Sequence, residues 1–254
     1  MSRSNPHEGS PNPAVRWFEW SGSKGLVRYY DKEKKENVTA TEPFTFMLLD
    51  QLGKVGGWHD ASDSGIYSNE VKDIRQELLV VKSFKGGVLA EGLYKDIKDR
   101  VNAQGGHYVA NLYIAFKLDG VLKIGSLRFK GAALSVWMEF VKANRAEVYK
   151  NAIQITGFTE GKKGSVTFRV PTFKLLTMSA ASNDAAVALD KELQDWLKGY
   201  FARNTGDRAD HAPTGPVEDY TPPEPEREYA TAGAIVALKS NFVSGFVTDD
   251  DIPF

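Results

Sequence analysis

Short runs of alternating apolar and polar residues follow one another through the first 180 residues of the chain. Gly, Asp and Pro residues separate the runs, which is the pattern of β-strands joined by turns. The runs predict strands at residues 14–20, 25–31, 43–49, 76–84, 86–92, 106–118, 121–130, 151–158, 165–171 and 172–178.

Three further segments carry apolar residues at helical spacing. Residues 93–103 and 131–145 each place one apolar stripe every three or four positions, which predicts two helices between strands. A third helix is expected over about residues 183–203, because the Ser-Asn-Asp sequence at residues 182–184 suits a helix N-cap. We expect this helix to dock on the body through a stripe of Leu189, Leu193, Trp196, Leu197 and Tyr200.

This order of elements predicts a mainly β fold with accessory helices. Many short strands with few helices favour an elaborated OB-fold-like barrel, although a β-sandwich gives a similar order. We expect residues 13–203 to form this OB-like domain and residues 1–12 to form a flexible N-terminal arm. Residues 204–248 are rich in proline and acid, a composition that buries too little apolar surface to fold, so we expect a disordered acidic linker there.

The clearest local prediction is a β-hairpin between residues 106–118 and 121–130. Asp119-Gly120 is a preferred two-residue hairpin turn, and it sets the register so that Leu118 faces Val121. Side chains alternate between the two faces of a strand, so one face becomes apolar core. That core face consists of Ala110, Leu112, Ile114, Phe116, Leu118, Val121, Leu127 and Phe129.

The other face of this hairpin carries an aromatic ring and several cations. Lys and Arg side chains track phosphates while a ring stacks on a base, which is how sequence-tolerant proteins bind single strands. The face also holds apolar residues, so we expect part of it to be covered, and a solvated hairpin face is the alternative interpretation. The candidate binding residues here are Asn111, Tyr113, Lys117, Arg128 and Lys130.

Basic and aromatic residues on other predicted strands and turns extend this candidate surface. Each residue alone is more typical of the core or of ordinary surface charge, and only their recurrence favours binding. These further candidates are Trp17, Arg28, Tyr29, Lys82, Lys162, Lys163 and Arg169.

Charge is divided unevenly along the chain, although its net value is only −1. Residues 204–254 hold ten acidic and three basic residues, a net charge of −7, while residues 1–203 hold 29 basic and 23 acidic residues, a net charge of +6. A basic body indicates a polyanionic partner. The sequence has no cysteine, no run of 18 apolar residues and no signal-like leader, so we expect a cytoplasmic protein without a membrane partner.

Catalytic motifs do not occur in the sequence. It contains no P-loop, GxGxxG, GxSxG or HExxH pattern, so we expect a binding protein without a cofactor rather than an enzyme. His59, Asp60 and Asp63 lie close together, but a polar turn explains them better than a metal site. A metal-dependent nuclease is the enzymatic alternative.

The last six residues, DDDIPF, resemble the acidic C-terminal tip of bacterial single-stranded-DNA-binding proteins. The resemblance covers this tip and the acidic character of the linker, whereas the body is longer and looks more like the OB-fold proteins that bacteriophages encode for this task. In that family the tip docks on replication, recombination and repair proteins. Carried over, Phe254 inserts in an apolar pocket, Ile252 packs beside it, Pro253 stiffens the approach, and Asp249, Asp250 and Asp251 meet a basic rim.

The resemblance therefore implies a sequence-tolerant protein, phage-encoded and acting in the bacterial cytoplasm, that coats single-stranded DNA and recruits partner proteins through residues 249–254. Two alternatives stay open. The chain could instead be an annealing or recombination mediator, or an adaptor that uses the tip to capture host repair proteins.

Overall fold

Residues 11–206 are described in the computed structural model of the chain. The expected docking tip, residues 249–254, lies outside the described residues. So do residues 1–10 of the expected arm and residues 207–248 of the expected linker.

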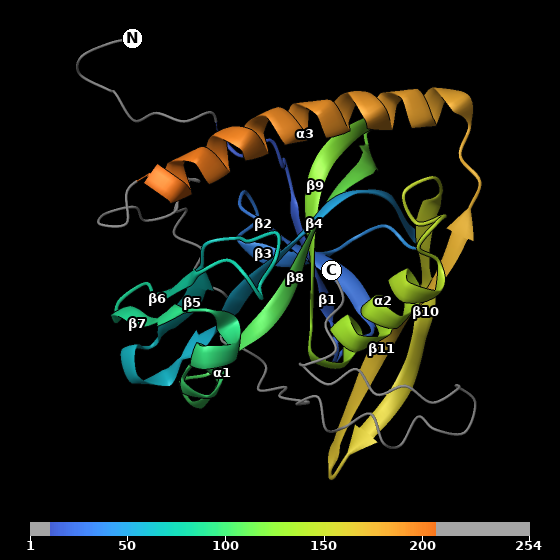
Figure 1. The fold of residues 1–254 in the computed structure, drawn as a ribbon. Helices are drawn as coiled ribbons and strands as arrows, with labels where there is room; N and C mark the ends of the chain where they lie inside the picture. Colours follow the sequence, from blue (N-terminus) through green and yellow to red (C-terminus); the bar gives the residue numbers. More distant parts are fainter. Residues whose placement is uncertain (1–10, 207–254) are drawn as a thin grey trace.

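Eleven strands and three α-helices make up the described part of the chain (Figure 1). The strands are β1 Trp17–Ser21, β2 Leu26–Asp31, β3 Glu36–Thr39, β4 Phe44–His59, β5 Ser64–Ser68, β6 Leu79–Ser83, β7 Gly87–Gly92, β8 Gly106–Leu118, β9 Val121–Lys130, β10 Ala152–Lys163 and β11 Val166–Leu176. The helices are α1 Tyr94–Ala103, α2 Gly131–Ala143 and α3 Ala180–Gly206, with a 3-10 turn at Asp60–Ser62. The prediction of a mainly β fold with accessory helices is confirmed.

All the strands belong to one mixed, open sheet. Its main path runs β3-β2-β1-β9-β8-β4-β5-β6-β7, and β10 pairs with both β4 and β11. The β1–β9 pair is parallel, and the other pairs are antiparallel. Strand β11 approaches the end of β1, where the backbone N–H of Arg169 donates a hydrogen bond to Gly22 O at 2.8 Å. The Trp20 indole N–H donates to Arg169 O at 2.9 Å.

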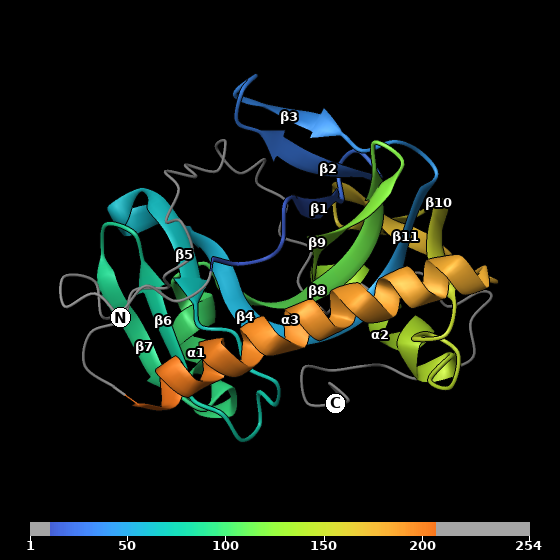
Figure 2. The same ribbon diagram turned by 90° about the horizontal axis from the view of Figure 1, so that it is seen from above.

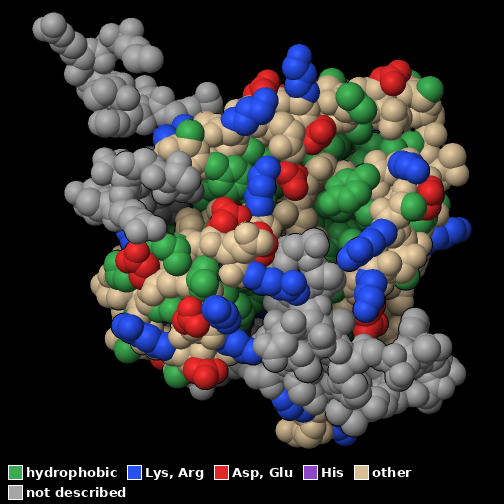
Figure 3. Space-filling model, viewed as in Figure 1, with side chains coloured by type: hydrophobic (Ala, Val, Ile, Leu, Met, Phe, Trp, Pro, Cys, Tyr) green, Lys and Arg blue, Asp and Glu red, His purple; other side chains and the backbone are tan. Residues whose placement is uncertain are grey.

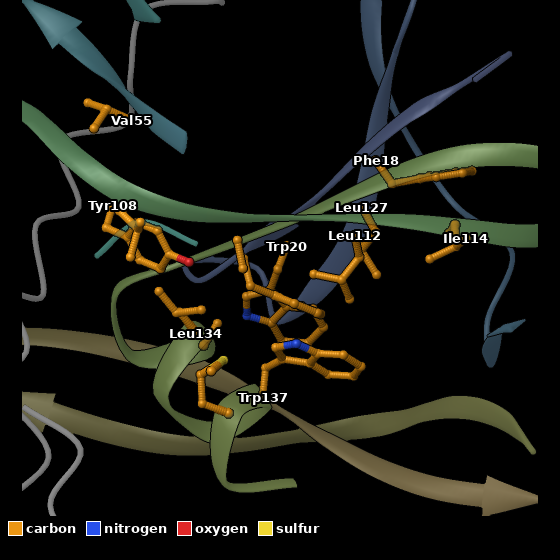
Figure 4. Packing of buried hydrophobic residues seen from close by; sticks show 14 of the residues in the cluster. Phe18, Trp20, Val55, Tyr108, Leu112, Ile114, Leu127, Leu134 and Trp137 are labelled. Atoms are coloured by element: carbon orange, nitrogen blue, oxygen red, sulfur yellow. The ribbon is translucent and has the colours of Figure 1, made fainter. Parts of the chain in front are cut away.

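The main core lies between the inner face of this sheet and helix α2, which packs beside the β10–β11 hairpin. Trp137 of α2 lies in this core near Leu134 (Figure 4) and is fully buried. Its ring is 5.6 Å from that of Phe129 and 5.3 Å from that of Phe173. Its indole N–H donates to Gln51 Oε1 at 2.7 Å, so the one polar atom of this large side chain is satisfied inside the core.

The register of the β8–β9 hairpin agrees with the prediction, since Leu118 faces Val121 and Phe116 faces Lys123. The core face is also confirmed for the residues farther from the turn, including Leu112 and Leu127, which are fully buried. The assignment of Val121 to this core face is wrong, because Val121 follows the turn directly and is 56% exposed. The turn itself has Asp119 at φ 51° and Gly120 at φ 82°, the left-handed conformation that this two-residue turn requires.

Several strand boundaries differ from the prediction. Strand β4 continues to His59 instead of ending at residue 49, and β3 and β5 were not predicted. The two strands expected at residues 165–171 and 172–178 are one continuous strand, β11. Gly57 and Gly105 explain the unexpected length of β4, because a Cβ on Gly57 would lie 2.1 Å from Gly105 O. Only glycine allows the two backbones to approach this closely.

Helix α3 lies across the side of the sheet opposite the main core (Figures 1 and 2). Its Leu193 and Leu197 are buried in a second apolar cluster with Leu49 of β4, Tyr113 of β8 and Ile124 of β9. The expected docking of this helix is confirmed. The long central strands are therefore covered on both sides along part of their length, and only the remainder of this second side is open to a ligand.

Candidate nucleic-acid interface

The second side of the sheet, which we call the outer face, carries a row of polar residues across neighbouring strands. Strand pairing places Arg28 beside Glu19, Glu19 beside Arg128, and Arg128 beside Asn111. The next row brings Lys130 beside Val109 and Val109 beside Lys54. Residues from five strands that are distant in sequence therefore share one surface, because alternate residues of each strand point to the same side.

Glu19 stands at the centre of the cations on the outer face. Its carboxylate accepts a hydrogen bond from Arg28 Nε at 2.8 Å and lies 3.7 Å from a terminal nitrogen of Arg128. Burial raises the pKa of Glu19, but Arg128, Arg28 and Lys130 outweigh burial and hold the pKa below its ordinary value. One carboxylate thus faces three cations.

Trp17 supplies an exposed ring next to this cluster. It is two residues before Glu19 on β1, so both side chains lie on the outer face, and its side chain is 37% exposed. Lys32 Nζ lies 5.9 Å from the centre of the Trp17 ring. The cluster thus combines an accessible aromatic surface with cations, which is what stacking on a base and contact with phosphates require.

A partly buried ion pair borders the cluster on the side of β4. Lys54 Nζ lies 2.8 Å from Glu70 Oε1, and the same carboxylate accepts hydrogen bonds from Asn111 at 2.9 Å and Tyr113 at 2.8 Å. Burial lowers the pKa of Lys54, Glu70 opposes this shift, and Arg128 adds to it. Glu70 and Lys54 belong to no sequence motif, and only the tertiary structure shows that they meet.

Two expected binding residues of the hairpin, Asn111 and Tyr113, are buried. Each is 1% exposed, so the expectation that they line an open face is wrong. Helix α3 covers this part of β8, with the Trp196 ring 6.0 Å from the Tyr113 ring. Their polar atoms bond to Glu70, and burial raises the pKa of Tyr113 well above its ordinary value, as Glu70 does too.

Tyr29 also differs from the expectation, because it faces the main core rather than the outer face. Its ring meets Phe18 edge-on at 5.7 Å, and the Arg16 guanidinium lies 4.1 Å from its centre. The neighbouring Tyr30 lies on the same side of β2 as Arg28. Side chains alternate along a strand, so Arg28 and Tyr30 point to one face and Tyr29 to the other. The sequence alone does not show which of the two adjacent tyrosines faces the core.

Arg169 is engaged in holding strands together. Its guanidinium pairs with Glu160 across the β10–β11 hairpin at 2.8 Å, donates to Ser23 O, and lies 5.1 Å from the Phe158 ring. Together with the backbone bonds to Gly22 and Trp20, these contacts make it a structural link between β11 and the β1–β2 turn.

The remaining candidates lie apart from the cluster. Lys162 and Lys163 are exposed near the end of the β10–β11 hairpin, which extends away from α3 in Figure 1. Lys117 is exposed near the β8–β9 turn, and Lys82 lies on β6. Of the residues expected from sequence, the structure brings together Trp17, Arg28, Arg128 and Lys130.

Figure 3 shows that Lys and Arg side chains are spread over the face seen there, with hydrophobic side chains and some acidic ones between them. This mixture does not form a large field of one sign.

Residues 11–206 contain no group of three or more His, Asp or Glu side chains placed to hold a metal ion. The Nδ1 atom of His59 instead lies 2.7 Å from Ser62 Oγ, in a hydrogen-bonded turn. Within the same range, none of the helices has the length and apolar character needed to cross a membrane.

Comparisons with models of protein families, with curated proteins and with solved structures find no match to this chain. The side chains of the outer face and the sequence of residues 249–254 are therefore the features that indicate a function.

Proposed function

We propose that the chain is a sequence-tolerant single-stranded-DNA-binding protein that holds the strand on the outer face of its sheet. The observation that carries this proposal is the convergence of Arg28, Arg128 and Lys130 on the single carboxylate of Glu19, beside the exposed ring of Trp17. Clustered cations attract phosphates, and the ring stacks on any base, so no base sequence is preferred.

An OB-like barrel is the finer description of the fold that we propose. Strands β1, β9, β8, β4, β10 and β11 follow one another by pairing. The hydrogen bonds that join Arg169 to Gly22 and Trp20 bring the last of these strands back to the first. This near-closure supports the barrel, and OB-folds commonly bind single strands across a strand face.

Recruitment of partner proteins through residues 249–254 is the second half of the proposal. It is supported by the resemblance of the DDDIPF sequence to the docking tip of bacterial single-stranded-DNA-binding proteins. Burial of Ile252 and Phe254 in a partner would contribute about 1.5–3 kcal/mol for each side chain. After ordering costs, a micromolar affinity, about −8 kcal/mol, is reasonable for such a peptide.

Titration of fluorescent oligo-dT against the full-length protein at several salt concentrations tests the first half. If about five phosphates are contacted, the logarithm of the association constant should fall with the logarithm of salt concentration with a slope of about −3 to −4. A slope of zero refutes the electrostatic interface, and the absence of any binding favours the adaptor. Loss of labelled strand in Mg²⁺ or Mn²⁺ would instead indicate a nuclease.

Deletion of residues 249–254 tests the division between DNA binding and recruitment. DNA binding should be retained or tightened, while binding to proteins that read the DDDIPF sequence should be lost. Loss of DNA binding on this deletion would contradict the division. Acceleration of complementary-strand pairing by the full-length protein would identify the annealing alternative.

A further inference from the structure

The strands β5, β6 and β7, which we call the second arm, carry exposed apolar side chains close together. Phe84, directly after β6, is 46% exposed, and Val88 of β7 is 56% exposed. The Phe84 ring contacts the ring of Tyr67 on β5, with centres 4.6 Å apart and planes inclined by 34°. Single exposed apolar residues are common, but a braced aromatic pair on neighbouring strands forms a patch that favours a ligand.

This patch is a continuation of the outer face. Pairing places Gly56 of β4 beside Tyr67, Tyr67 beside Lys82, and Lys82 beside Val88. The alternate residues of the same strands, such as Val81, are buried in the main core. Gly56 is two residues beyond Lys54, so the row with Tyr67 and Lys82 lies next to the row with Lys54 and Lys130.

Figure 2 shows the two ends of this surface. The second arm and the group β1, β2 and β3 stand on either side of the central strands β4, β8 and β9, and α3 crosses the central strands. Five pairing steps separate β1 from β6. At about 4.8 Å for each step, this is roughly 24 Å across the strands. The Trp17 row reaches β4 at Asp50 and the Tyr67 row reaches it at Gly56, six residues or about 20 Å farther along, so the two ends are roughly 31 Å apart.

The second arm also carries positive charge beside its rings. Lys82 lies between Tyr67 and Val88, and it makes no ion pair with any residue in the range 11–206. Lys85 follows Phe84, and its Nζ atom donates to a backbone carbonyl, that of Asp63, at 3.2 Å, which leaves its charge uncompensated by that contact. An aromatic surface with cations is thus repeated at both ends of the outer face.

We propose that Phe84, braced by Tyr67 and flanked by Lys82 and Lys85, is a second stacking site for the same DNA strand. This inference rests on the proposed function, and it adds the path of the strand. The strand enters at Trp17, crosses the rows that hold Arg128, Lys130 and Lys54, and reaches the second arm. A path of roughly 31 Å corresponds to about five nucleotides of extended strand, within the about 4–16 nucleotides that one OB fold contacts.

The test compares Phe84→Ala with wild type on two lengths of oligo-dT, about 3 nucleotides, too short to reach both ends of the face, and about 16 nucleotides. The longer strand reaches both ends of the face, so its affinity should fall about 5- to 150-fold, the range for loss of one stacked base. The shorter strand still binds at the end that holds Trp17, so its affinity should fall by no more than about twofold. Phe84 is exposed, so the variant is expected to fold as wild type does.

Tyr149→Ala is the matched control, because this ring is also exposed, at 56%, and lies in the turn after α2 rather than on the outer face. It should bind both oligonucleotides as wild type does. If Phe84→Ala binds the longer strand within about twofold of wild type, the second site is refuted while the proposed function stands. If wild type binds neither strand, both the function and this inference are refuted.

A second measurement uses the unaltered protein and does not depend on how a variant folds. Ultraviolet crosslinking to oligo-dT that contains 5-iododeoxyuridine should label the peptide that contains Phe84, besides a peptide that contains Trp17. Labelling at Trp17 alone overturns the inference. So does an equal loss of affinity for both lengths in Phe84→Ala, since this would place one undivided contact on the second arm.

Discussion

Glu19→Gln changes the outer face at its centre while keeping the size of the side chain. In the wild-type protein the carboxylate lies 2.8 Å from Arg28 Nε and 3.7 Å from a terminal nitrogen of Arg128. It therefore competes with any phosphate for these cations. Removing its charge should tighten DNA binding, because the cations no longer have to leave a carboxylate when a phosphate arrives.

The size of this effect follows from the geometry. A phosphate on the far side of either arginine would lie about 7 Å from the Glu19 carboxylate, where the repulsion is about 0.6 kcal/mol at a dielectric constant of about 80 and about 2.4 kcal/mol at about 20. The variant should thus bind about 3- to 50-fold more tightly at low salt. Each cation freed should steepen the salt slope by up to about 0.7.

The same substitution should destabilise the folded protein. The side chains of Arg28, Glu19 and Arg128 are 21%, 23% and 32% exposed, so these pairs are neither fully buried nor free in solvent. Surface pairs contribute up to about 1 kcal/mol and breaking a buried pair costs about 3–5 kcal/mol. We expect a loss of about 1–2 kcal/mol in the free energy of unfolding, measured by urea denaturation.

Glu160→Gln is the control for net charge. Glu160 pairs with Arg169 at 2.8 Å on the β10–β11 hairpin, so its substitution changes the protein's charge by the same amount away from the Glu19 cluster. Fluorescence titrations of oligo-dT at low and moderate salt should show the increase only for Glu19→Gln. Equal changes in the two variants, or weaker binding by a folded Glu19→Gln protein, would refute the proposed role of this face.

Other substitutions test separate parts of the structure. Trp17→Ala should weaken oligo-dT binding by about 1–3 kcal/mol in a titration, and an unchanged dissociation constant would remove this ring from the interface. The pKa of Glu19 lies below its ordinary 4.5, so the ionised carboxylate stabilises the folded protein above pH 4.5. This contribution to the free energy of unfolding is lost as the pH falls through the lowered pKa. Urea denaturation at decreasing pH should therefore show a steeper loss for wild type than for Glu19→Gln, and parallel curves would contradict the ion pairs. Leu193→Ala should cost about 2–5 kcal/mol of unfolding free energy, since this residue of α3 is fully buried, whereas Val187→Ala, 61% exposed, should cost less than about 0.5 kcal/mol. Similar losses for the two would mean that α3 does not dock on the sheet as described.

Sequence reasoning succeeded where the structural signal is local. The Asp119-Gly120 turn determines the β8–β9 register within a few residues, so both the pairing and the core face follow from the chain itself. The apolar stripe of α3 likewise predicts that the helix docks, since a helix with one apolar side must bury it. Neither prediction needed any knowledge of distant partners.

The errors arose where distant parts of the chain meet. Tyr113 reads as an exposed binding residue until Trp196 of α3 and the Glu70 carboxylate are placed against it. The long strand β4 contains Gly53, Gly56 and Gly57, which weaken its β-pattern in sequence. In the fold, residue 57 must be glycine because its backbone lies against the backbone of Gly105. This contact joins residues 48 positions apart, so the sequence around Gly57 does not reveal it.

The position of α3 bears on whether the acidic residues after it compete with DNA. Near the end of the helix, the Tyr200 hydroxyl accepts a hydrogen bond from Glu70 N at 2.7 Å, and the Glu70 carboxylate is paired with Lys54. Gly206 is six residues beyond Tyr200, about 9 Å along a helix, so the chain leaves the described structure close to the outer face.

A tethered segment has an effective concentration of the order of millimolar. Surface ion pairs contribute at most about 1 kcal/mol each, so a tail that makes about four of them binds the face with a dissociation constant that is also about millimolar or weaker. Such a tail would reduce DNA affinity by only about twofold. A much larger increase in DNA affinity after deletion of residues 249–254 would therefore mean that the body contains a specific site for the tip, beyond the attraction of opposite charges.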